Sequence, residues 1–216
     1  MASHPERSIP LVVVIDDDAD VRVALTGLFR SVGLDTAPFA SVREWLDAGL
    51  ADRPGCIVLD VRLPGQSGLD FQDELVKSNR RLPIIFISGH ADIAMSVRAM
   101  KAGAIEFLAK PVRDQDLLDA VQLAITHDQR RRSAEGDVAR LRADYEALST
   151  RERQILAHVV TGRRNKQIAA DLGITEATVK FHRTHIMQKL RVLSVVELVR
   201  IADGLGLTNQ PTSTKV

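Results

Sequence analysis

The amino-acid sequence predicts two domains, an α/β domain built on a doubly wound, five-stranded parallel sheet and an all-α domain after it. Three observations support this prediction. Short apolar runs alternate with segments of helical spacing, the last third of the chain holds only short helix-like segments, and 216 residues are enough for two domains. We place the first domain at 1–127, a helical linker at 128–147 and the second domain at 148–216.

Five apolar runs form the predicted sheet. They are LVVVI (11–15), LDTAP (34–38), CIVLD (56–60), PIIFIS (83–88) and AIEFLA (104–109). Most are apolar throughout and do not alternate, which is typical of strands covered on both faces. Helical segments such as the one from Asp92 to Gly103 separate them. Right-handed crossovers then give a parallel sheet with a flavodoxin-like strand order.

The linker contains a short apolar stripe. Val138, Leu141, Tyr145 and Leu148 are spaced by three and four residues, as on one face of a helix. This stripe fits pairing with another helix and fits equally well packing on a neighbouring domain. Gly136 is a candidate break in the helix, so both a continuous and an interrupted linker stay open.

The second domain contains a predicted helix-turn-helix. Ser149 or Thr150 begins a first helix, with Glu152 close behind as in a capping box. Two further helices flank the turn LGI at 172–174, and Thr175 caps the second of them. On that helix the inward side holds Val179, Ile186 and Leu190, while the outward side holds Lys180, Phe181, Thr184, His185 and Gln188.

Charge is distributed unevenly along the chain. Residues 1–127 hold 13 Lys/Arg and 18 Asp/Glu, whereas residues 149–216 hold 11 and 5, a net charge of +6. A basic terminal domain is typical of nucleic-acid binding, although a solvated basic face gives the same count. No run approaches the length of a membrane span, and MASHPERS at the N-terminus lacks the core of a secretory signal. We therefore expect a cytoplasmic protein without a membrane partner.

Acidic side chains follow the predicted strands at one edge of the sheet. Asp16 and Asp17 close the first strand, Asp60 the third, Ser88 the fourth and Lys110 the fifth. Parallel strands present their carboxyl ends at the same edge, so these five residues are expected to converge. Three clustered carboxylates repel one another unless a cation lies among them, and oxygen ligands suit Mg²⁺. The sequence therefore predicts a magnesium site.

Asp60 has a second predicted role. A carboxylate attacks phosphorus when a metal and fixed donors neutralise the incoming group. Ser88 offers a hydroxyl and Lys110 an ammonium group at the same edge. This combination predicts a phosphoryl-acceptor site. The lone Cys56 lies in an apolar run and is expected to pack as a small hydrophobic residue.

Four sequence blocks resemble the receiver domain of two-component response regulators. They are IDDD (15–18), VLDVRLPGQSG (58–68), FISGH (86–90) and FLAKP (107–111). The resemblance covers about residues 9–127. It implies that Asp60 is phosphorylated and that Mg²⁺ is held by Asp16, Asp17, Asp60 and the Arg62 carbonyl. It also implies that Ser88 and Lys110 sense the phosphate and that Ser88 and Phe107 act as the switch pair. Phe107 replaces the commoner Tyr and lacks its hydroxyl.

Residues 148–190 resemble the helix-turn-helix of the LuxR/NarL/FixJ group, and the domain order resembles FixJ-type transcription regulators. The resemblance implies a dimerisation helix at 194–202. It also implies base contacts from Lys180, Phe181 and Thr184, and phosphate contacts from Asn165, Lys166 and Lys189. Arg183 leans toward the buried side, and we expect its stem to pack while its charge stays in water.

These observations predict a transcription regulator that turns over no separate substrate. A sensor histidine kinase would phosphorylate Asp60 and so control homodimerisation and promoter binding, with RNA polymerase as a further candidate partner. One alternative is a phosphatase of the haloacid-dehalogenase type, with Asp16 as the nucleophile. It needs a later acidic pair at a strand end, and the candidates after Lys110 lie in a helix. Another alternative is an output surface that binds a protein in place of DNA.

Overall fold

A computed structural model of the chain describes residues 9–78, 81–89 and 92–207. The chain divides into two compact units, Met1–Arg132 and Ser133–Val216. The first unit ends later than the predicted boundary at residue 127, because charged side chains just beyond that point bond to the sheet domain. Each unit has its own apolar core.

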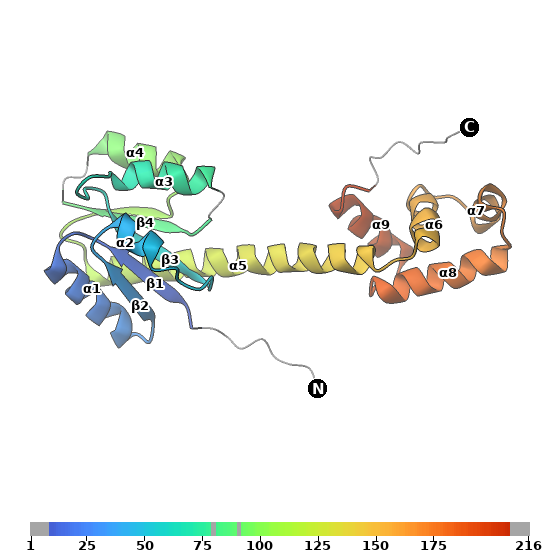
Figure 1. Ribbon diagram of the computed structural model, residues 1–216, viewed down its shortest axis with the longest axis horizontal. Coiled ribbons are helices and arrows are strands. Elements are labelled where there is room, and N and C mark those ends of the chain that lie inside the picture. Colours follow the sequence, from blue (N-terminus) through green and yellow to red (C-terminus); the bar gives the residue numbers. More distant parts are fainter. Residues whose placement is uncertain (1–8, 79–80, 90–91, 208–216) are drawn as a thin grey trace. The chain divides into compact units, whose positions relative to one another are not determined.

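The first unit is built on one parallel sheet. Its strands are β1 (Leu11–Ile15), β2 (Asp35–Phe39), β3 (Gly55–Asp60), β4 (Ile84–Ser88) and β5 (Glu106–Ala109). The order is β2-β1-β3-β4-β5, and every neighbouring pair is parallel (Figure 1). The flavodoxin-like strand order expected from the sequence is therefore confirmed. It places the ends of β1, β3, β4 and β5 side by side.

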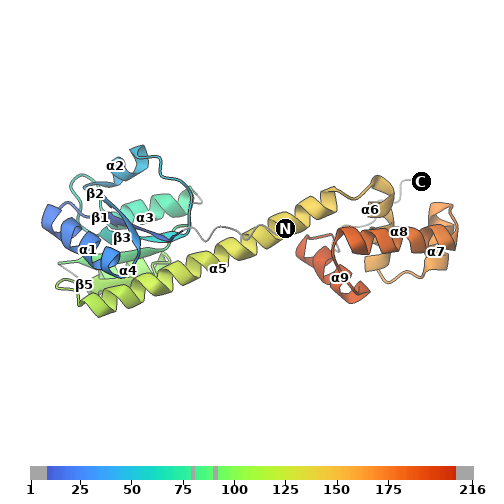
Figure 2. The same cartoon turned by 90° about the horizontal axis from the view of Figure 1, so that it is seen from below.

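Helices cover both faces of the sheet (Figure 1 and Figure 2). One core contains residues of α2 (Val42–Asp47), α3 (Gly68–Lys77) and α4 (Ile93–Lys101). The other core contains residues of α1 (Ala19–Ser31) and α5 (Asp114–Glu146). Consecutive residues of a strand pack into opposite cores. In β1, for example, Val13 belongs to the first core and Val12 to the second. In the first core, Trp45 packs edge-on to Phe71 with ring centroids 5.5 Å apart.

Cys56 is fully buried in the second core, as the sequence predicted. Burial and the nearby Asp128 carboxylate raise the pKa of its thiol to about 12. The thiolate is the reactive form of cysteine, so this side chain acts as packing.

Gly68 marks a close approach between the start of α3 and the end of β3. A Cβ atom at residue 68 would lie 2.5 Å from the Asp60 carbonyl oxygen and 3.2 Å from side-chain atoms of Leu59 and Phe86. The Gly68 amide donates to the Val61 carbonyl at 2.9 Å, so the backbone has little room to shift. The structure therefore requires the absence of a side chain at residue 68.

Gly68→Ala is therefore expected to lower the free energy of unfolding of the first unit by about 1–3 kcal/mol, as overpacking does. Chemical denaturation followed by circular dichroism measures this change. The matched control is Gly136→Ala, because Gly136 lies within α5 with nothing within 4 Å of its added Cβ. That substitution should stabilise the helix by up to about 1 kcal/mol. Equal effects of the two substitutions would contradict the steric explanation.

The linker is helical throughout, because α5 continues from Asp114 to Glu146 without a break at Gly136. Its apolar stripe is divided between two environments. Val138 is exposed, whereas Tyr145 and Leu148 pack into the core of the second unit. The last part of the stripe therefore lies on a domain, which was one of the two possibilities left open.

Asp128 fixes α5 to the sheet. It is fully buried and accepts the Gly55 amide, at the start of β3, at 3.1 Å. Its carboxylate also pairs with Arg131 at 2.5 Å and with Arg132 at 2.7 Å. Arg132 in turn reaches Asp52 at 2.6 Å. This cluster was not predicted, because the pattern of residues 128–132 is that of an exposed, charged helix.

The second unit contains α6 (Thr150–Val160), α7 (Asn165–Leu172), α8 (Glu176–Lys189) and α9 (Val195–Gly204). Ser149 and Glu152 form the predicted capping box at the start of α6. Gly173 has a φ of 64°, which turns the chain between α7 and α8, and Thr175 caps α8. The predicted helix-turn-helix is present. Of the helices that the structure describes, none is both long enough and apolar enough to cross a membrane.

Candidate functional site

Two buried carboxylates and one lysine meet at the carboxyl edge of the sheet. Asp16 follows β1, Asp60 ends β3, and both are buried. The Lys110 ammonium Nζ lies 2.7 Å from Asp16 Oδ2 and 3.0 Å from Asp60 Oδ1. The strand order produces this meeting, because it brings together the ends of strands that are far apart in the sequence. We call these three residues the acidic pocket.

Backbone amides hold the remaining carboxylate oxygens of the acidic pocket. The Asp18 amide donates to Asp16 Oδ1 at 2.9 Å, and the Arg62 amide donates to Asp60 Oδ2 at 2.8 Å. The Arg22 guanidinium also donates to the Asp16 carbonyl at 2.6 Å. Asp18 has a separate role as the N-cap of α1, where its side chain accepts from the Asp20 amide. The orientation of both buried carboxylates is therefore fixed.

Burial raises the pKa of Asp60 above its ordinary value, although the hydrogen bonds from Lys110 and the Arg62 amide act in the opposite direction. Partial burial of Lys110 lowers the pKa of its ammonium group, but the hydrogen bonds to Asp16 and Asp60 outweigh this effect and the pKa is raised. Lys110 therefore stays charged. One ammonium group beside two carboxylates leaves the acidic pocket able to accept further positive charge.

Asp17 does not join the acidic pocket as expected. It is exposed, and among the residues that the structure describes no group of three or more His, Cys, Asp or Glu side chains is placed to hold a metal ion. Successive residues of an extended chain point in opposite directions, and Asp16 takes the inward one. The structure therefore pairs Asp16 and Asp60 through Lys110, and a role for Asp17 in binding Mg²⁺ stays a prediction.

Ser88 is buried at the end of β4, and its carbonyl accepts the Lys110 amide at 2.8 Å. This bond holds the fourth and fifth strand ends together. Phe107 on β5 is half-buried, with its ring centroid 6.1 Å from that of Phe86. The Lys110–Pro111 peptide bond is cis. His90 lies outside the described residues.

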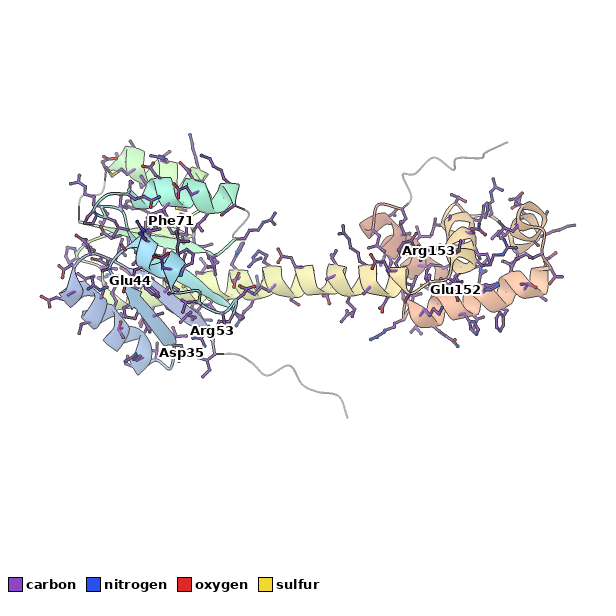
Figure 3. All side chains as sticks on the ribbon, viewed as in Figure 1. Asp35, Glu44, Arg53, Phe71, Glu152 and Arg153 are labelled. Carbon is purple, nitrogen blue, oxygen red and sulfur yellow. The ribbon has the colours of Figure 1, made fainter. Side chains whose placement is uncertain are left out.

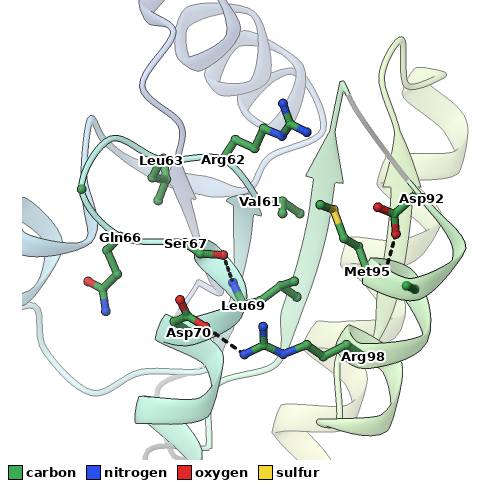
Figure 4. Close-up of a pocket in the computed structure, with 12 residues that line it drawn as sticks. Val61, Arg62, Leu63, Gln66, Ser67, Leu69, Asp70, Asp92, Met95 and Arg98 are labelled. Atoms are coloured by element: carbon green, nitrogen blue, oxygen red, sulfur yellow. Dashed lines mark hydrogen bonds and ion pairs between the residues drawn. The ribbon is translucent and has the colours of Figure 1, made fainter.

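A groove of about 720 Å³ lies next to Asp60, between the loop after β3 and the start of α4 (Figure 4). Arg98 of α4 closes one side of it by pairing with Asp70 at 2.8 Å and with Asp73 at 2.7 Å, both on α3. These ion pairs were missed from the sequence, because partners 25 and 28 residues apart on different helices leave no local pattern.

The outward face of α8 is the candidate nucleic-acid interface. Lys180, Phe181 and Thr184 are exposed on it, and Lys166 is exposed on α7. The inward residues Val179, Ile186 and Leu190 are buried, as the helical spacing predicted. The outward residues are thus free of the core.

Two of the expected phosphate contacts also have partners inside the second unit. Asn165 Oδ1 accepts a hydrogen bond from Arg183 at 2.7 Å. The Arg183 guanidinium therefore has a partner on α7 that the helical spacing did not predict. Lys189 Nζ donates to the buried Glu152 at 2.7 Å. A phosphate contact by Lys189 would have to compete with this ion pair.

The Glu152 side chain is labelled in Figure 3, and its carboxylate gives the second unit a testable pH dependence. Burial raises its pKa, but bonds from Lys189 and Ser149 outweigh burial and hold the pKa below its ordinary value. A depressed folded-state pKa stabilises the fold above the unfolded-state value of about 4.3. That stability is lost as the pH falls from this value through the folded-state pKa.

Glu152→Gln is therefore expected to lower stability by about 1 kcal/mol at pH 7, and the difference from the unchanged protein should shrink toward pH 3. Thermal unfolding measured between pH 7 and pH 3 checks this. Glu146→Gln, at an exposed residue of α5, is the control and should leave stability nearly unchanged at every pH. A constant difference between the Glu152 variant and the unchanged protein would contradict the assigned ionisation.

Comparisons with known families match both units. Residues 12–122 match the response regulator receiver domain, and residues 146–202 match the bacterial regulatory proteins of the luxR family. The two matches cover both the acidic pocket and the outward face of α8.

Whole-length relatives carry both domains. Nodulation protein W of Bradyrhizobium diazoefficiens is 51% identical over 99% of this chain and 95% of its own. Transcriptional regulatory protein FixJ of Azorhizobium caulinodans is 40% identical over 96% and 98%. The response regulator StyR is similar in structure, with 44% identity over 91% of this chain and 99% of its own and a TM-score of 0.83. The comparisons give no support to a phosphatase. The chain thus belongs to the two-component response regulators that join a receiver domain to a LuxR-type DNA-binding domain and regulate transcription.

Proposed function

We propose that Asp60 is the phosphoacceptor of this response regulator. The observation that carries the proposal is the buried Asp60 carboxylate with Lys110 Nζ 3.0 Å away at the carboxyl edge of the sheet. An Asp60 oxygen attacks the phosphorus of the kinase's phosphohistidine, the P–N bond breaks, and the departing imidazole takes up a proton. The chain promotes its own phosphoryl transfer and the later hydrolysis, and turns over no other substrate.

The donor set of the acidic pocket fits Mg²⁺. Asp16 and Asp60 supply hard oxygen ligands. The exposed Asp17 directly follows Asp16 in the sequence, and Arg62, whose carbonyl is a further candidate ligand, lies two residues after Asp60. Their combined charge exceeds what one lysine neutralises. When bound, the metal would neutralise the oxygens of the incoming phosphoryl group. The residues assigned to hold it are Asp16, Asp17, Asp60 and Arg62.

Phosphorylation adds a dianion beside Lys110 and Ser88, which would draw both toward Asp60. Phe107 packs beside β4 and has no hydroxyl, so it would respond by repacking. The adjoining α4 presents three exposed apolar side chains, Ile93, Val97 and Met100. We assign this α4 and β5 face to homodimerisation.

We assign the outward face of α8 to the major groove of promoter DNA. Lys180, Phe181 and Thr184 are the base-contacting candidates. Lys166 and Asn165 on α7, and Lys189 where it leaves Glu152, are the phosphate-contacting candidates. A dimer would present two such faces to two half-sites. RNA polymerase is then a further candidate partner at the promoter.

Acetyl phosphate with Mg²⁺ is expected to convert the chain to a dimer and raise its promoter affinity at least tenfold, since two linked modules bind as one unit. Size-exclusion chromatography and DNA titration at fixed salt measure both effects. Chelation of Mg²⁺ before the phosphodonor is added should prevent both. Dimerisation with a protein partner bound and no DNA bound would favour the protein-binding alternative.

A further inference from the structure

Phe181 is the most unusual side chain on the outward face of α8. Phe181 is 57% exposed, whereas Val179 and Ile186 of the same helix are buried. It lies beside Lys180 and one turn before Thr184 and His185 on the same helix. A large exposed aromatic ring in the centre of a DNA-facing helix has no role in the core of the second unit.

The Phe181 ring is also held in place. The His185 ring packs against it with centroids 4.1 Å apart and an angle of 59° between the planes. The His182 ring contacts it edge-on at 5.7 Å. Two neighbours on the same helix therefore fix the direction of the ring and cover part of its surface. A pre-positioned side chain loses little conformational entropy when it binds.

The neighbouring polar groups leave apolar contact as the main means of reading bases at this position. The Thr184 hydroxyl donates to the Lys180 carbonyl at 3.2 Å, which occupies its hydrogen. Lys180 remains as a flexible cation. In the major groove of ordinary DNA the apolar group on a base edge is the 5-methyl group of thymine, and aromatic side chains contact it. Cytosine at the same place would bury its amino group without a partner.

We propose that Phe181, positioned by His185, reads a thymine 5-methyl group in each half of the operator. The inference rests on the proposed binding of α8 in the major groove and adds the base that it recognises there. Phe181 is the specificity-determining residue, and His185 is a positioning residue that acts through it.

The test begins with the full-length chain, phosphorylated by acetyl phosphate, selecting its operator from a random double-stranded DNA library. Each thymine of the selected site is then replaced by deoxyuridine, which removes only the methyl group. Burial of one such group is worth about a fourfold change in affinity. Symmetric replacement in both half-sites is therefore expected to weaken binding by about 15-fold at one pair of positions and not elsewhere, at constant salt.

Variants assign that loss to Phe181. Phe181→Ala should bind the thymine and deoxyuridine operators equally, so the effects of the two changes are coupled. His185→Ala should keep only part of the methyl preference. Lys180→Ala is the matched control on the same face, and it should weaken both operators by the same factor. The exposed position of Phe181 makes loss of folding unexpected, and unchanged circular dichroism verifies that.

Methyl sensitivity that persists in Phe181→Ala would overturn the proposal, as would an unchanged affinity after every deoxyuridine replacement. Both outcomes leave DNA binding by α8 intact. A selection that enriches no sequence would instead reject the proposed function, and the thymine reading with it.

Discussion

Asp60→Asn is expected to abolish phosphate uptake completely. An amide is a poor nucleophile, so Asn at position 60 cannot take over the role that we assign to the buried Asp60 carboxylate beside Lys110. Incubation with radiolabelled acetyl phosphate and Mg²⁺ measures the loss. Dimerisation and the gain in promoter affinity should disappear with the label.

Asp47→Asn is a suitable control for this prediction. Asp47 is exposed at the end of α2, in a pair with Arg43 whose atoms are 3.8 Å apart. This variant should take up phosphate at the rate of the unchanged protein. Asp60→Asn also removes a carboxylate whose pKa is raised by burial, so without Mg²⁺ the variant should be at least as stable as the unchanged protein at pH 7. Label retained in Asp60→Asn would reject this residue as the phosphoacceptor.

Asp128→Ala is expected to cost the first unit about 3–5 kcal/mol of unfolding free energy. The substitution removes the carboxylate that faces Arg131 and Arg132 and leaves the buried Gly55 amide without its acceptor. A domain of this size is stable by only about 5–15 kcal/mol, so the loss is a large fraction of the total. Urea denaturation followed by circular dichroism measures it.

Asp52→Ala is the matched control, since Asp52 pairs with the same Arg132 but its side chain is 86% exposed. Exposed ion pairs contribute about 0–1 kcal/mol, so this variant should remain close to the unchanged protein. Similar losses of unfolding free energy from both substitutions would mean that burial does not determine how much each ion pair of the cluster contributes to stability. Asp128→Asn separates charge from hydrogen bonding, because an amide oxygen still accepts the Gly55 amide.

The sheet could be predicted from the sequence because its strands are buried on both faces. All residues of β3 are buried, as expected for a parallel strand that has helices on both faces, and such a strand is apolar throughout. The edge strand β2 was placed one residue early, because only its last residue, Phe39, is buried and the strand therefore gives a weaker apolar pattern. Whether α5 continues through Gly136 could not be predicted, because one glycine lowers the stability of a long helix by only about 1 kcal/mol.

The acidic pocket could be predicted as far as strand ends determine it. Asp16, Asp60 and Lys110 meet because β1, β3 and β5 end at the same edge of the sheet, with only β4 between β3 and β5. The direction of Asp17 could not be predicted, because it depends on the local turn after β1. Contacts between distant elements, such as Asp128 with Gly55 across 73 residues, follow from packing and leave no periodic pattern. The hydrogen bond from Arg183 to Asn165 also joins two different helices. The spacing of residues along one helix therefore could not predict it.

Trp45 is the single tryptophan of the chain and Tyr145 the single tyrosine. The indole lies in the core between the sheet and α3, against Phe71, whereas the phenol packs on the core of the second unit. Fluorescence excited at the red edge of the indole band would therefore report on the receiver domain alone. Each domain thus carries its own intrinsic optical probe, and the two could be observed separately without an attached dye.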